Sequence, residues 1–382
     1  MTLLLVVFFS SLLVLFYMYF FYPAILWVLG FFVREVAPGQ SVEWPSVSLI
    51  IAAYNEEKYI GEKIANSLSQ NYPRGQFQII VISDGSSDKT LEIATDFKDD
   101  RLVVIEVAER MGKANALNQG LAVATGDIIV FTDANVFFEP ESIQVLVKHF
   151  SNECCGAVSG RVELVAMNDG EPLGEGAYMK YERFIQKCES KINTMVGVDG
   201  GMFAIRKRLI NEVPINIILD DFYLAMKVLA SKSKITYESN ALAKEWVPAS
   251  VAQEFRRKVR IAAGGFQVLR HIEFLRRPFS NIVATTFFIS HKLFRWLSPF
   301  FMMALLASNA YLLTVDSFFV LSFFLQMFFY SLAIVGIFVP SLRERTFIYV
   351  PYYFLAVNAA FFVGFWKNLF GTQKVTWSRV DR

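Results

Sequence analysis

Gly126-Asp127-Ile128-Ile129-Val130-Phe131-Thr132-Asp133-Ala134-Asn135 is the stretch that indicates the fold of this 382-residue chain most directly. Residues 127–132 are a short, β-branched and mostly apolar run, which is typical of a strand buried on both faces. Asp133 and Asn135 follow where this strand ends, the position at which open α/β sheets bind ligands. Oxygen ligands at i and i+2 suit a divalent ion that already carries phosphates, because it needs only one or two protein oxygens. A plain Asp/Asn turn gives the same pattern, so both interpretations stay open here.

The surrounding sequence alternates between strand and helix signals. The clearest apolar strands are predicted at residues 47–53, 78–83 and 102–107. Helices are predicted after Asn55, which we expect to act as a cap, after Asp88 and over 112–124. Later strands are shorter, at 157–164, 202–205 and 235–238, with helices near 176–190 and 221–230. This alternation indicates βαβ units with right-handed crossovers, and therefore an α/β fold with a mostly parallel sheet.

The composition indicates a membrane protein. Hydrophobic residues make up 54% of the chain and 38 residues are Phe, which is too apolar for a wholly soluble protein. The stretch Leu3–Phe32 has no charge and is long enough to span a bilayer with tilt, and Pro23 can kink it. Arg34 then places the following residues in the cytosol and the amino terminus outside. The net charge of +2 gives no support for a nucleic-acid partner, and the three cysteines are expected to be free thiols.

The carboxyl-terminal third poses a problem of membrane topology. A capping box at Ser250–Gln253 predicts a helix to about Leu275 with cations on an amphipathic surface, which suits the membrane interface. Three further spans are predicted, at 293–313, 318–339 and 348–365. Four crossings in all would place the tail outside, whereas its Lys and Arg residues favour the cytosol. We expect a cytosolic tail, with one apolar segment re-entrant or interfacial, and leave the number of crossings open.

These signals divide the chain into five parts. We expect an N-terminal transmembrane helix at 1–33, a cytosolic α/β domain at 45–250, interfacial amphipathic helices at 251–292, C-terminal transmembrane segments at 293–366 and a basic tail at 367–382.

Several polar motifs would meet Asp133 in one crevice. Asp84 and the segment 54–56 end two neighbouring strands and could contact a nucleobase or ribose, although an Asx turn and a helix cap explain them equally well. Lys113 follows a glycine and could balance a diphosphate, or be a solvated surface lysine. The pair Asp220-Asp221 could supply a general base, or simply favour a helix start. Residues 198–201 suit a close approach to a sugar, or a plain turn.

Taken together, these motifs resemble membrane-bound family-2 glycosyltransferases of the polysaccharide-synthase branch, which includes cellulose, hyaluronan and poly-N-acetylglucosamine synthases. The resemblance covers about residues 45–300 and implies the Rossmann-like GT-A fold. It also implies a nucleotide-sugar donor and Mg²⁺ or Mn²⁺. The residues that match the donor site of the family are Tyr54, Glu56, Asp84, Lys113, Asp133, Gly200, Gly201, Arg257 and Arg260. The match to the metal motif is Asp133 with Asn135, and Asp221, beside Asp220, matches the catalytic base.

Two departures from the family pattern bear on function. Asn135 replaces the second acid of the DxD motif, so metal binding is expected to depend mainly on Asp133 and the phosphates. Arg257 and Ile261 replace the Gln and Trp of QxxRW, which weakens the case for processive synthesis. Arg260 remains and could hold the pyrophosphate, although contact with anionic lipid is an alternative.

The resemblance leads us to expect inverting transfer from a nucleotide-sugar, most simply a UDP-sugar, to a growing or lipid-linked glycan. The reaction would occur at the cytosolic face of the cell (inner) membrane, in exopolysaccharide or cell-surface glycan synthesis. Export partner proteins are left open as further partners. One alternative is a single-addition transferase acting on a polyprenyl-phosphate-linked intermediate. A second is an inactive membrane conduit or partner subunit, against which the acids Asp84, Asp133 and Asp221 argue.

Overall fold

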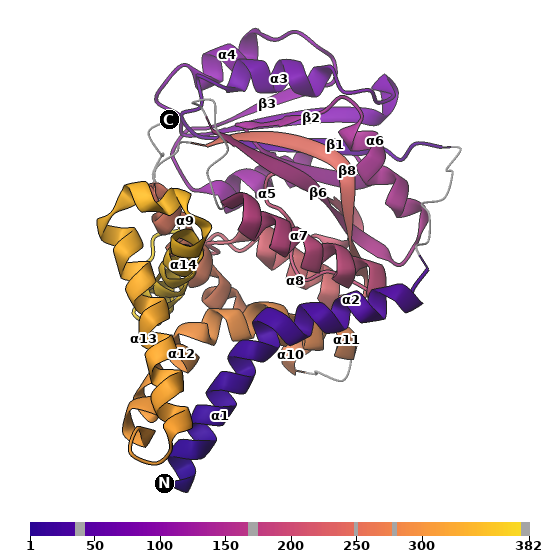
Figure 1. The fold of residues 1–382 in the computed structure, drawn as a ribbon. Coiled ribbons are helices and arrows are strands. Elements are labelled where there is room, and N and C mark those ends of the chain that lie inside the picture. The colour runs from indigo at the N-terminus through magenta and orange to yellow at the C-terminus, as the bar shows by residue number, and fades with distance from the viewer. Residues whose placement is uncertain (35–42, 167–174, 248–250, 277–280, 376–382) are drawn as a thin grey trace.

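The computed structural model describes residues 1–34, 43–166, 175–247, 251–276 and 281–375. Within them an eight-stranded sheet has the order β3-β2-β1-β4-β7-β6-β8-β5 (Figure 1). The strands are β1 Val47–Ala53, β2 Phe77–Asp84, β3 Leu102–Val107, β4 Ile128–Asp133, β5 Val136–Phe138, β6 Cys155–Ala166, β7 Phe203–Arg206 and β8 Lys234–Val247.

The helices fall into two groups, those that cover the sheet and those near the ends of the chain. The first group is α3 Ile60–Leu68, α4 Thr90–Asp96, α5 Lys113–Val123, α6 Ser142–Val147, α7 Glu175–Ile192, α8 Asp220–Ala230 and α9 Val251–Val268. The second is α1 Thr2–Phe16, α2 Tyr22–Phe32, α10 Glu273–Arg276, α11 Ile282–Phe287, α12 Phe294–Leu312, α13 Ser317–Phe338 and α14 Thr346–Leu369. Two π-helical segments, Tyr17–Phe21 and Phe288–Leu293, lead into α2 and α12. Short 3₁₀ turns lie at Arg74–Gln76, Lys148–Ser151, Lys207–Leu209, Leu269–His271 and Pro340–Glu344.

The first half of the sheet is parallel, as the sequence predicts. β1 pairs in parallel with β2 and β4, and β2 pairs in parallel with β3. The second half is mixed, because β7 runs antiparallel to β4 and β6, and β5 runs antiparallel to β8. β6 and β8 pair in parallel across a register shift. The α/β prediction is confirmed, and the antiparallel pairs make the sheet less uniformly parallel than we expected.

Helices cover both faces of the sheet, which explains why the strands read as continuous apolar runs. Leu49 and Ile51 of β1 belong to a core cluster shared with α3, whereas Ile50 and Ala52 belong to one shared with α5 and α8. Figure 1 shows α3 and α4 on one side of the sheet and α7 and α8 on the other. The second cluster extends through α9, α11 and α12 to α14 and α2. This cluster therefore joins the sheet to α2, α12 and α14.

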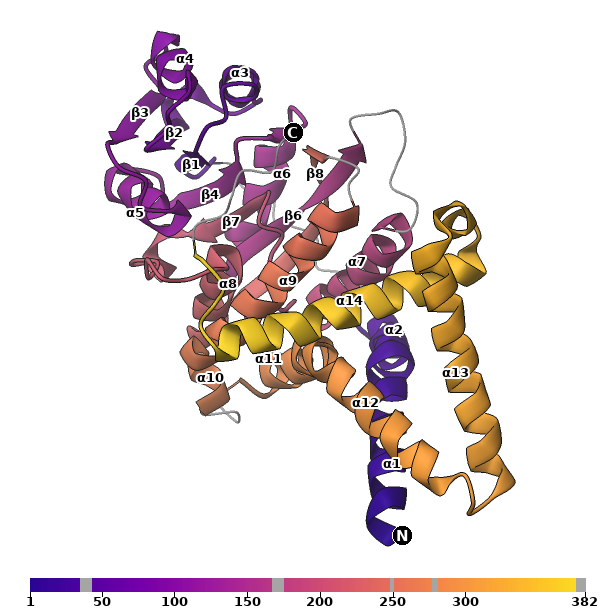
Figure 2. The same cartoon turned by 90° about the vertical axis from the view of Figure 1, so that its left-hand side faces the viewer.

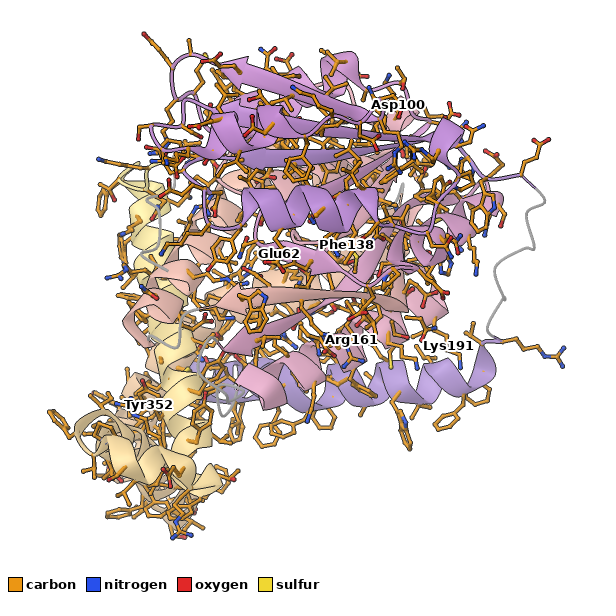
Figure 3. All side chains as sticks on the ribbon, turned by 90° about the horizontal axis from the view of Figure 1, so that it is seen from above. Glu62, Asp100, Phe138, Arg161, Lys191 and Tyr352 are labelled. Atoms are coloured by element: carbon orange, nitrogen blue, oxygen red, sulfur yellow. The ribbon has the colours of Figure 1, made fainter. Side chains whose placement is uncertain are left out.

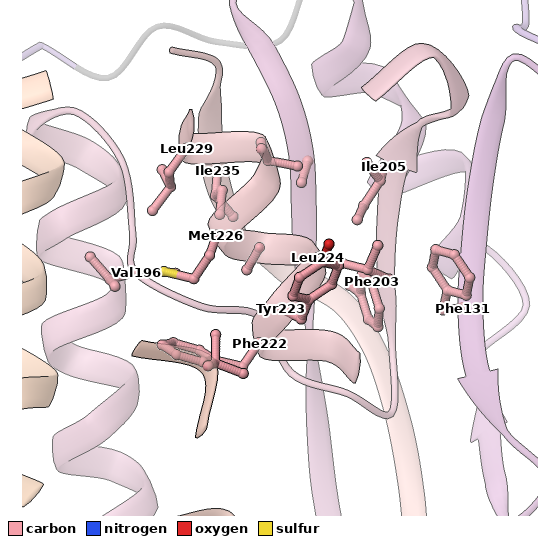
Figure 4. Close-up of a cluster of buried hydrophobic side chains, with 14 of the residues drawn as sticks. Phe131, Val196, Phe203, Ile205, Phe222, Tyr223, Leu224, Met226, Leu229 and Ile235 are labelled. Atoms are coloured by element: carbon pink, nitrogen blue, oxygen red, sulfur yellow. The ribbon is translucent and has the colours of Figure 1, made fainter. Parts of the chain in front are cut away.

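α8 shows how this core positions the acids at the start of that helix. Figure 4 shows Tyr223 and Leu224 of α8 beside Phe203 of β7, whereas Phe222 and Met226 lie on the other side of the helix, Met226 near Val196. All of these side chains are buried. Because α8 is packed on both sides, the start of the helix is fixed in position.

Some local predictions are wrong. Asn55 does not cap the first helix, because α3 begins only at Ile60, whose N–H donates to the carbonyl of Glu56. Asn55 instead takes a φ of 55°, and its side-chain oxygen accepts from the N–H of Ser87 at 2.8 Å. β5 was not predicted, β8 is much longer than expected, and α9 ends at Val268. The proposed cap residue Ser250 lies outside the described residues.

Three segments of the described chain are long and apolar enough to cross a membrane, namely Thr2–Phe32, Ser317–Phe338 and Thr346–Leu369. They agree with three of the four predicted spans. The fourth prediction folds as α12, which is not among these segments and buries polar side chains, including Ser298 and Asn309. The predicted kink in the first segment is also present. α2 turns away from α1 after the π-helical segment and just before Pro23 (Figure 1).

A buried cluster of charges joins α7 to the start of α12. The two ring nitrogens of His291 each lie 2.9 Å from a carboxylate oxygen, one of Glu182 and one of Glu189. Glu182 also accepts from Lys292 at 2.8 Å and from Arg295 at 2.6 Å. Burial by itself would raise the pKa of Glu182, but the neighbouring His291, Lys292 and Arg295 hold it well below its usual range. The cluster therefore ties the sheet domain to the terminal helices by charge as well as by apolar packing.

Candidate active site

The carboxyl ends of the parallel strands place several predicted residues close together. Asp133 is the last residue of β4, and Lys113 is the first residue of α5. Nζ of Lys113 lies 2.7 Å from Asp133 Oδ1 and 3.4 Å from Asp220 Oδ2. Burial lowers the pKa of Lys113, but the negative charges of these two carboxylates outweigh it and raise the pKa above its ordinary value. Lys113 is therefore an ion-paired residue at the centre of the site, and the alternative of a solvated surface lysine is excluded.

Asp221 lies beside the glycine turn that precedes β7. Its Oδ1 accepts from the N–H of Phe222 at 2.6 Å. A Cβ atom added to Gly200 would lie only 2.5 Å from Asp221 Oδ2, so the carboxylate rests directly against the backbone of Gly200. Burial, together with the negative charge of Asp220, raises the pKa of Asp221 to about 6. A carboxylate with a pKa in this range is well suited to accept a proton near neutral pH.

Asp199 is an acidic residue near Asp221 that we did not single out from the sequence. It belongs to the predicted 198–201 turn, and its Oδ1 accepts from the N–H of Gly201 at 3.2 Å. Burial and the negative charge of Glu245 raise the pKa of Asp199 to about 7. The glycine pair drew attention to this turn in the sequence, but it gave no reason to select the acid before it.

Lys63 is a second residue that the sequence did not reveal. It lies on α3, has no exposed surface, and donates to Thr132 Oγ1 at 3.1 Å and to the carbonyl of Val136. Burial lowers its pKa to about 7, although the charge of Asp133 acts in the opposite direction. Lys63 thus bridges the end of β4 and the start of β5, and it fixes the turn that carries Asp133 and Asn135. In the sequence it looked like an ordinary polar position of an amphipathic helix.

Asp84 and Tyr54 make contacts within the protein that bear on the predicted nucleotide site. The two oxygens of Asp84 accept from the N–H groups of Met111 at 3.0 Å and Gly112 at 2.8 Å, and the residue is 4% exposed. Asp84 therefore shapes the loop that presents Lys113. The guanidinium of Arg110 lies 3.7 Å from the ring centroid of Tyr54, so a base that stacks on Tyr54 would use the opposite face of the ring.

Side chains of α9 form hydrogen bonds with residues 216–218, the segment just before Asp220 and Asp221. Nη2 of Arg260 donates to the carbonyl of Ile218 at 3.1 Å. Gln267 accepts from the N–H of Ile218 at 2.9 Å and donates to the carbonyl of Asn216 at 2.7 Å. The side chain of Arg257 is 45% exposed near the amino end of the same helix. Arg260 therefore contacts the approach to Asp220, and its predicted contact with a pyrophosphate stays a prediction.

Comparison with known proteins identifies the domain that carries these residues. The family model described as Glycosyl transferase family 2 matches residues 48–213, the segment that carries Asp84, Lys113, Asp133 and the glycine pair. The chain therefore contains a family 2 glycosyltransferase domain. The predicted resemblance and the predicted enzyme class are confirmed at the level of this domain.

Relatives of the glycosyltransferase domain include two synthases. The chain is 30% identical over 276 residues to a poly-beta-1,6-N-acetyl-D-glucosamine synthase of Staphylococcus epidermidis. It is 28% identical over 272 residues to the enzyme of that name in Staphylococcus aureus. Each match covers 65% of this chain and 65% of the relative, so the chain spans somewhat less than two thirds of these proteins.

The fold of the chain is also found in a solved glycosyltransferase. A mannosyltransferase of Pyrobaculum calidifontis, solved in complex with GDP-Man and Mn²⁺, superposes with a TM-score of 0.71 at 22% identity. The superposition covers 96% of this chain and 100% of that one, so the shared fold includes the terminal helices. The GT-A fold prediction is therefore confirmed.

Asp133 and Asn135 are the residues predicted to contact a divalent metal ion, and the structure shows how each is placed. No group of three His, Cys, Asp or Glu side chains that could hold a metal occurs among the described residues. The side chain of Asp133 is 37% exposed and can offer a carboxylate oxygen. Asn135 is only 3% exposed, and its Nδ2 lies 3.3 Å from Glu245 Oε1. One carboxylate is sufficient for an ion already bound to phosphates, whereas the role of Asn135 as a ligand stays a prediction.

Proposed function

We propose that the chain transfers a sugar, with inversion, from a nucleotide-sugar to a growing or lipid-linked glycan at the cytosolic face of the membrane. The donor we favour is a UDP-sugar, and the product belongs to exopolysaccharide or cell-surface glycan synthesis. The observation that carries the proposal is the arrangement of a lysine, paired to Asp133 and Asp220, next to a partly buried acid, Asp221, of raised pKa. The names of the staphylococcal relatives support the class of product.

Each group in this arrangement has a chemical task. Asp221 takes the proton from the acceptor hydroxyl while that oxygen attacks the anomeric carbon, opposite the bond to the diphosphate. The bond between the anomeric carbon and the diphosphate oxygen breaks, and the diphosphate leaves with the electron pair. Lys113 stabilises the charge that develops on the leaving group. Asp220 pairs with Lys113, and its negative charge contributes to the raised pKa of Asp221.

A divalent metal, Mg²⁺ or Mn²⁺, would supply further positive charge at the diphosphate. Asp133 is the residue that would hold it, with Asn135 as a second ligand. We expect Asp133→Ala to abolish the Mn²⁺-dependent part of donor binding, because no other carboxylate ends β4. Asn135→Ala should have the smaller effect. If Asn135→Ala weakens Mn²⁺-dependent binding as much as Asp133→Ala does, the ligand assignment is wrong.

The experiment that tests the proposal is a donor panel. Purified protein is incubated with radiolabelled UDP-, GDP- and dTDP-sugars, with and without Mn²⁺, and both binding and release of the nucleotide are measured. We expect binding and turnover with one nucleotide class. Lack of any turnover across the panel would instead favour the inactive membrane conduit.

A second candidate function is a single addition to a polyprenyl-phosphate-linked intermediate. Ile261, at the position of the QxxRW tryptophan, favours it, since α9 offers no ring there on which a growing glycan could stack. The length of the product distinguishes the two. A ladder of products is expected of a synthase, and one added sugar is expected of the single-addition enzyme.

A further inference from the structure

The helix α14 is apolar enough to cross a membrane, yet its contacts lie on one side of the molecule. Its amino-terminal half packs on the end of α13, where a Cβ added to Gly336 would lie 2.8 Å from Tyr352 Cβ. Its carboxyl-terminal half packs on α9, where a Cβ added to Gly364 would lie 2.5 Å from Ala262 Cβ. α9 in turn holds the approach to the catalytic acids through Arg260. Both halves of α14 are therefore held against elements at the level of the catalytic domain.

α1, α12 and α13 instead reach away from the catalytic domain. Phe8 of α1, Leu312 of α12 and Phe319 of α13 form a separate apolar cluster at the far end. At the near end, Tyr17 Oη lies 2.8 Å from Ser290 Oγ, and the ring of Trp296 lies 5.6 Å from that of Phe222. At about 1.5 Å per residue, α12 and α13 are about 28 and 33 Å long, which matches a hydrocarbon core of about 30 Å.

Figure 2 shows how α14 differs in direction from α1 and α13. α1 and α13 run along one direction away from the catalytic domain, whereas α14 runs crosswise beneath it. The yellow chain beyond α14, residues 371–375, turns back beside the domain. Figure 3, seen from above, places Tyr352 of α14 at the opposite corner of the molecule from Asp100. Burial agrees, because the most apolar stretch of α14 is more extensively buried than that of α13.

We propose that α14 lies in the membrane interface on the side of the catalytic domain and does not cross the bilayer. Its partner is the headgroup and upper acyl region of the lipids. The side chains that would enter this region include Phe347, Val350, Trp366 and Leu369, which are 39–65% exposed. A large aromatic side chain such as that of Trp366 is favoured at this depth.

This placement resolves the conflict between the two topology rules. The bilayer is then crossed three times, by the first helix, α12 and α13, so the segment after α14 is on the same side as the catalytic domain. α12 is less apolar than the other two, but its Ser298 and Asn309 are hydrogen-bonded to Asn358 of α14 and Ser322 of α13. Arg34, Arg343, Lys367 and Lys374 all lie on that side, as the positive-inside rule requires. The loop between α12 and α13, at 313–316, has no Lys or Arg and lies on the other side.

Accessibility of single cysteines to a membrane-impermeant maleimide tests the proposal in spheroplasts that express the full chain. The exposed Cys154 of the unchanged protein marks the catalytic side. In a background that carries Cys154→Ser, Cys155→Ala and Cys188→Ala, Val315→Cys should be labelled in intact spheroplasts. Lys374→Cys should be labelled only after permeabilisation, as Cys154 is. Labelling of Lys374→Cys in intact spheroplasts would overturn the proposal, because that segment would then lie outside.

Depth in the bilayer provides a second, independent measurement. A nitroxide label is attached at Ala359→Cys, an exposed position in the middle of α14, and at Phe328→Cys, which is 61% exposed in the middle of α13. Collision rates with oxygen and with a water-soluble nickel chelate then report the depth of each label in reconstituted vesicles. The label at 359 should lie near the surface and the label at 328 near the bilayer centre. Equal central depths for both labels would show that α14 crosses.

Discussion

Replacing Asp220 with Asn should shift the acidic side of the pH–rate profile for sugar transfer to lower pH without abolishing activity. The pKa of Asp221 is raised to about 6 by burial and by the negative charge of Asp220. Removing that charge lowers the pKa of Asp221. Because the base must be ionised to accept a proton, the rate falls as pH decreases through this pKa. A lower pKa therefore preserves activity in more acidic solution.

The size of the effect follows from the fraction of ionised base. At pH 5 a base with a pKa of about 6 is ionised in about one molecule in ten, and one with an ordinary aspartate pKa in about nine in ten. Burial remains in the variant, so its pKa lies between these limits. We expect the rate at pH 5, relative to that at pH 8, to rise by between about twofold and ninefold. Lys113 keeps its ion pair with Asp133, so the site retains its lysine.

The assay is the initial rate of sugar transfer from pH 5 to pH 8 at constant ionic strength, expressed as kcat/KM. Asp100→Asn, an exposed surface change, serves as the matched control and should leave the profile unchanged. An acidic side of the profile that is identical in Asp220→Asn and the unchanged protein would refute the reasoning. Loss of activity at every pH would also refute it, because Asp220 would then itself be the base.

Two further predictions follow from packing and charge. Gly200→Ala should lower kcat at least about tenfold with little change in Tm, because the added Cβ would displace the Asp221 carboxylate. Gly75→Ala is the control and should have no effect, because there is open space around Gly75. Normal kcat in Gly200→Ala would contradict the contact. Glu182→Gln should lower the free energy of unfolding by about 3–5 kcal/mol, since the buried Arg295 and the partly buried Lys292 lose their partner charge. Glu153→Gln, at an exposed ion pair, should lower it by less than about 1 kcal/mol. Denaturant unfolding in detergent measures both, and equal losses would contradict the importance of the buried cluster.

The parallel half of the sheet could be predicted because each of its strands is recognisable from its own sequence. β1 to β4 are apolar runs bounded by turns, and the helices between them have one apolar face. The strands of the mixed half are harder to recognise from their sequences. β5 has only three residues, and β8 includes polar residues such as Glu238 and Asn240 that broke the predicted strand early. Its length comes from pairing with β6 and β5, which a local pattern does not record.

The site was predicted where residue types repeat a family pattern and missed where contacts join distant parts of the chain. Asp133, Lys113 and Asp221 were expected together, and Lys113 lies between Asp133 and Asp220. Lys63 could not be recognised, because its role depends on burial under a turn about 70 residues later. The cluster around Glu182 joins residues more than 100 positions apart and gave no sequence signal for the same reason.

The most direct test of Asp221 as the base is sugar transfer by Asp221→Asn, measured alongside donor binding. The amide keeps the shape of the side chain, and its oxygen can still accept from the N–H of Phe222. We expect turnover to fall at least about a hundredfold, the usual scale of general-base catalysis, while the Kd for the nucleotide-sugar with Mn²⁺ is unchanged. Near-normal turnover in this variant would contradict the account, because the proton would then leave by another group.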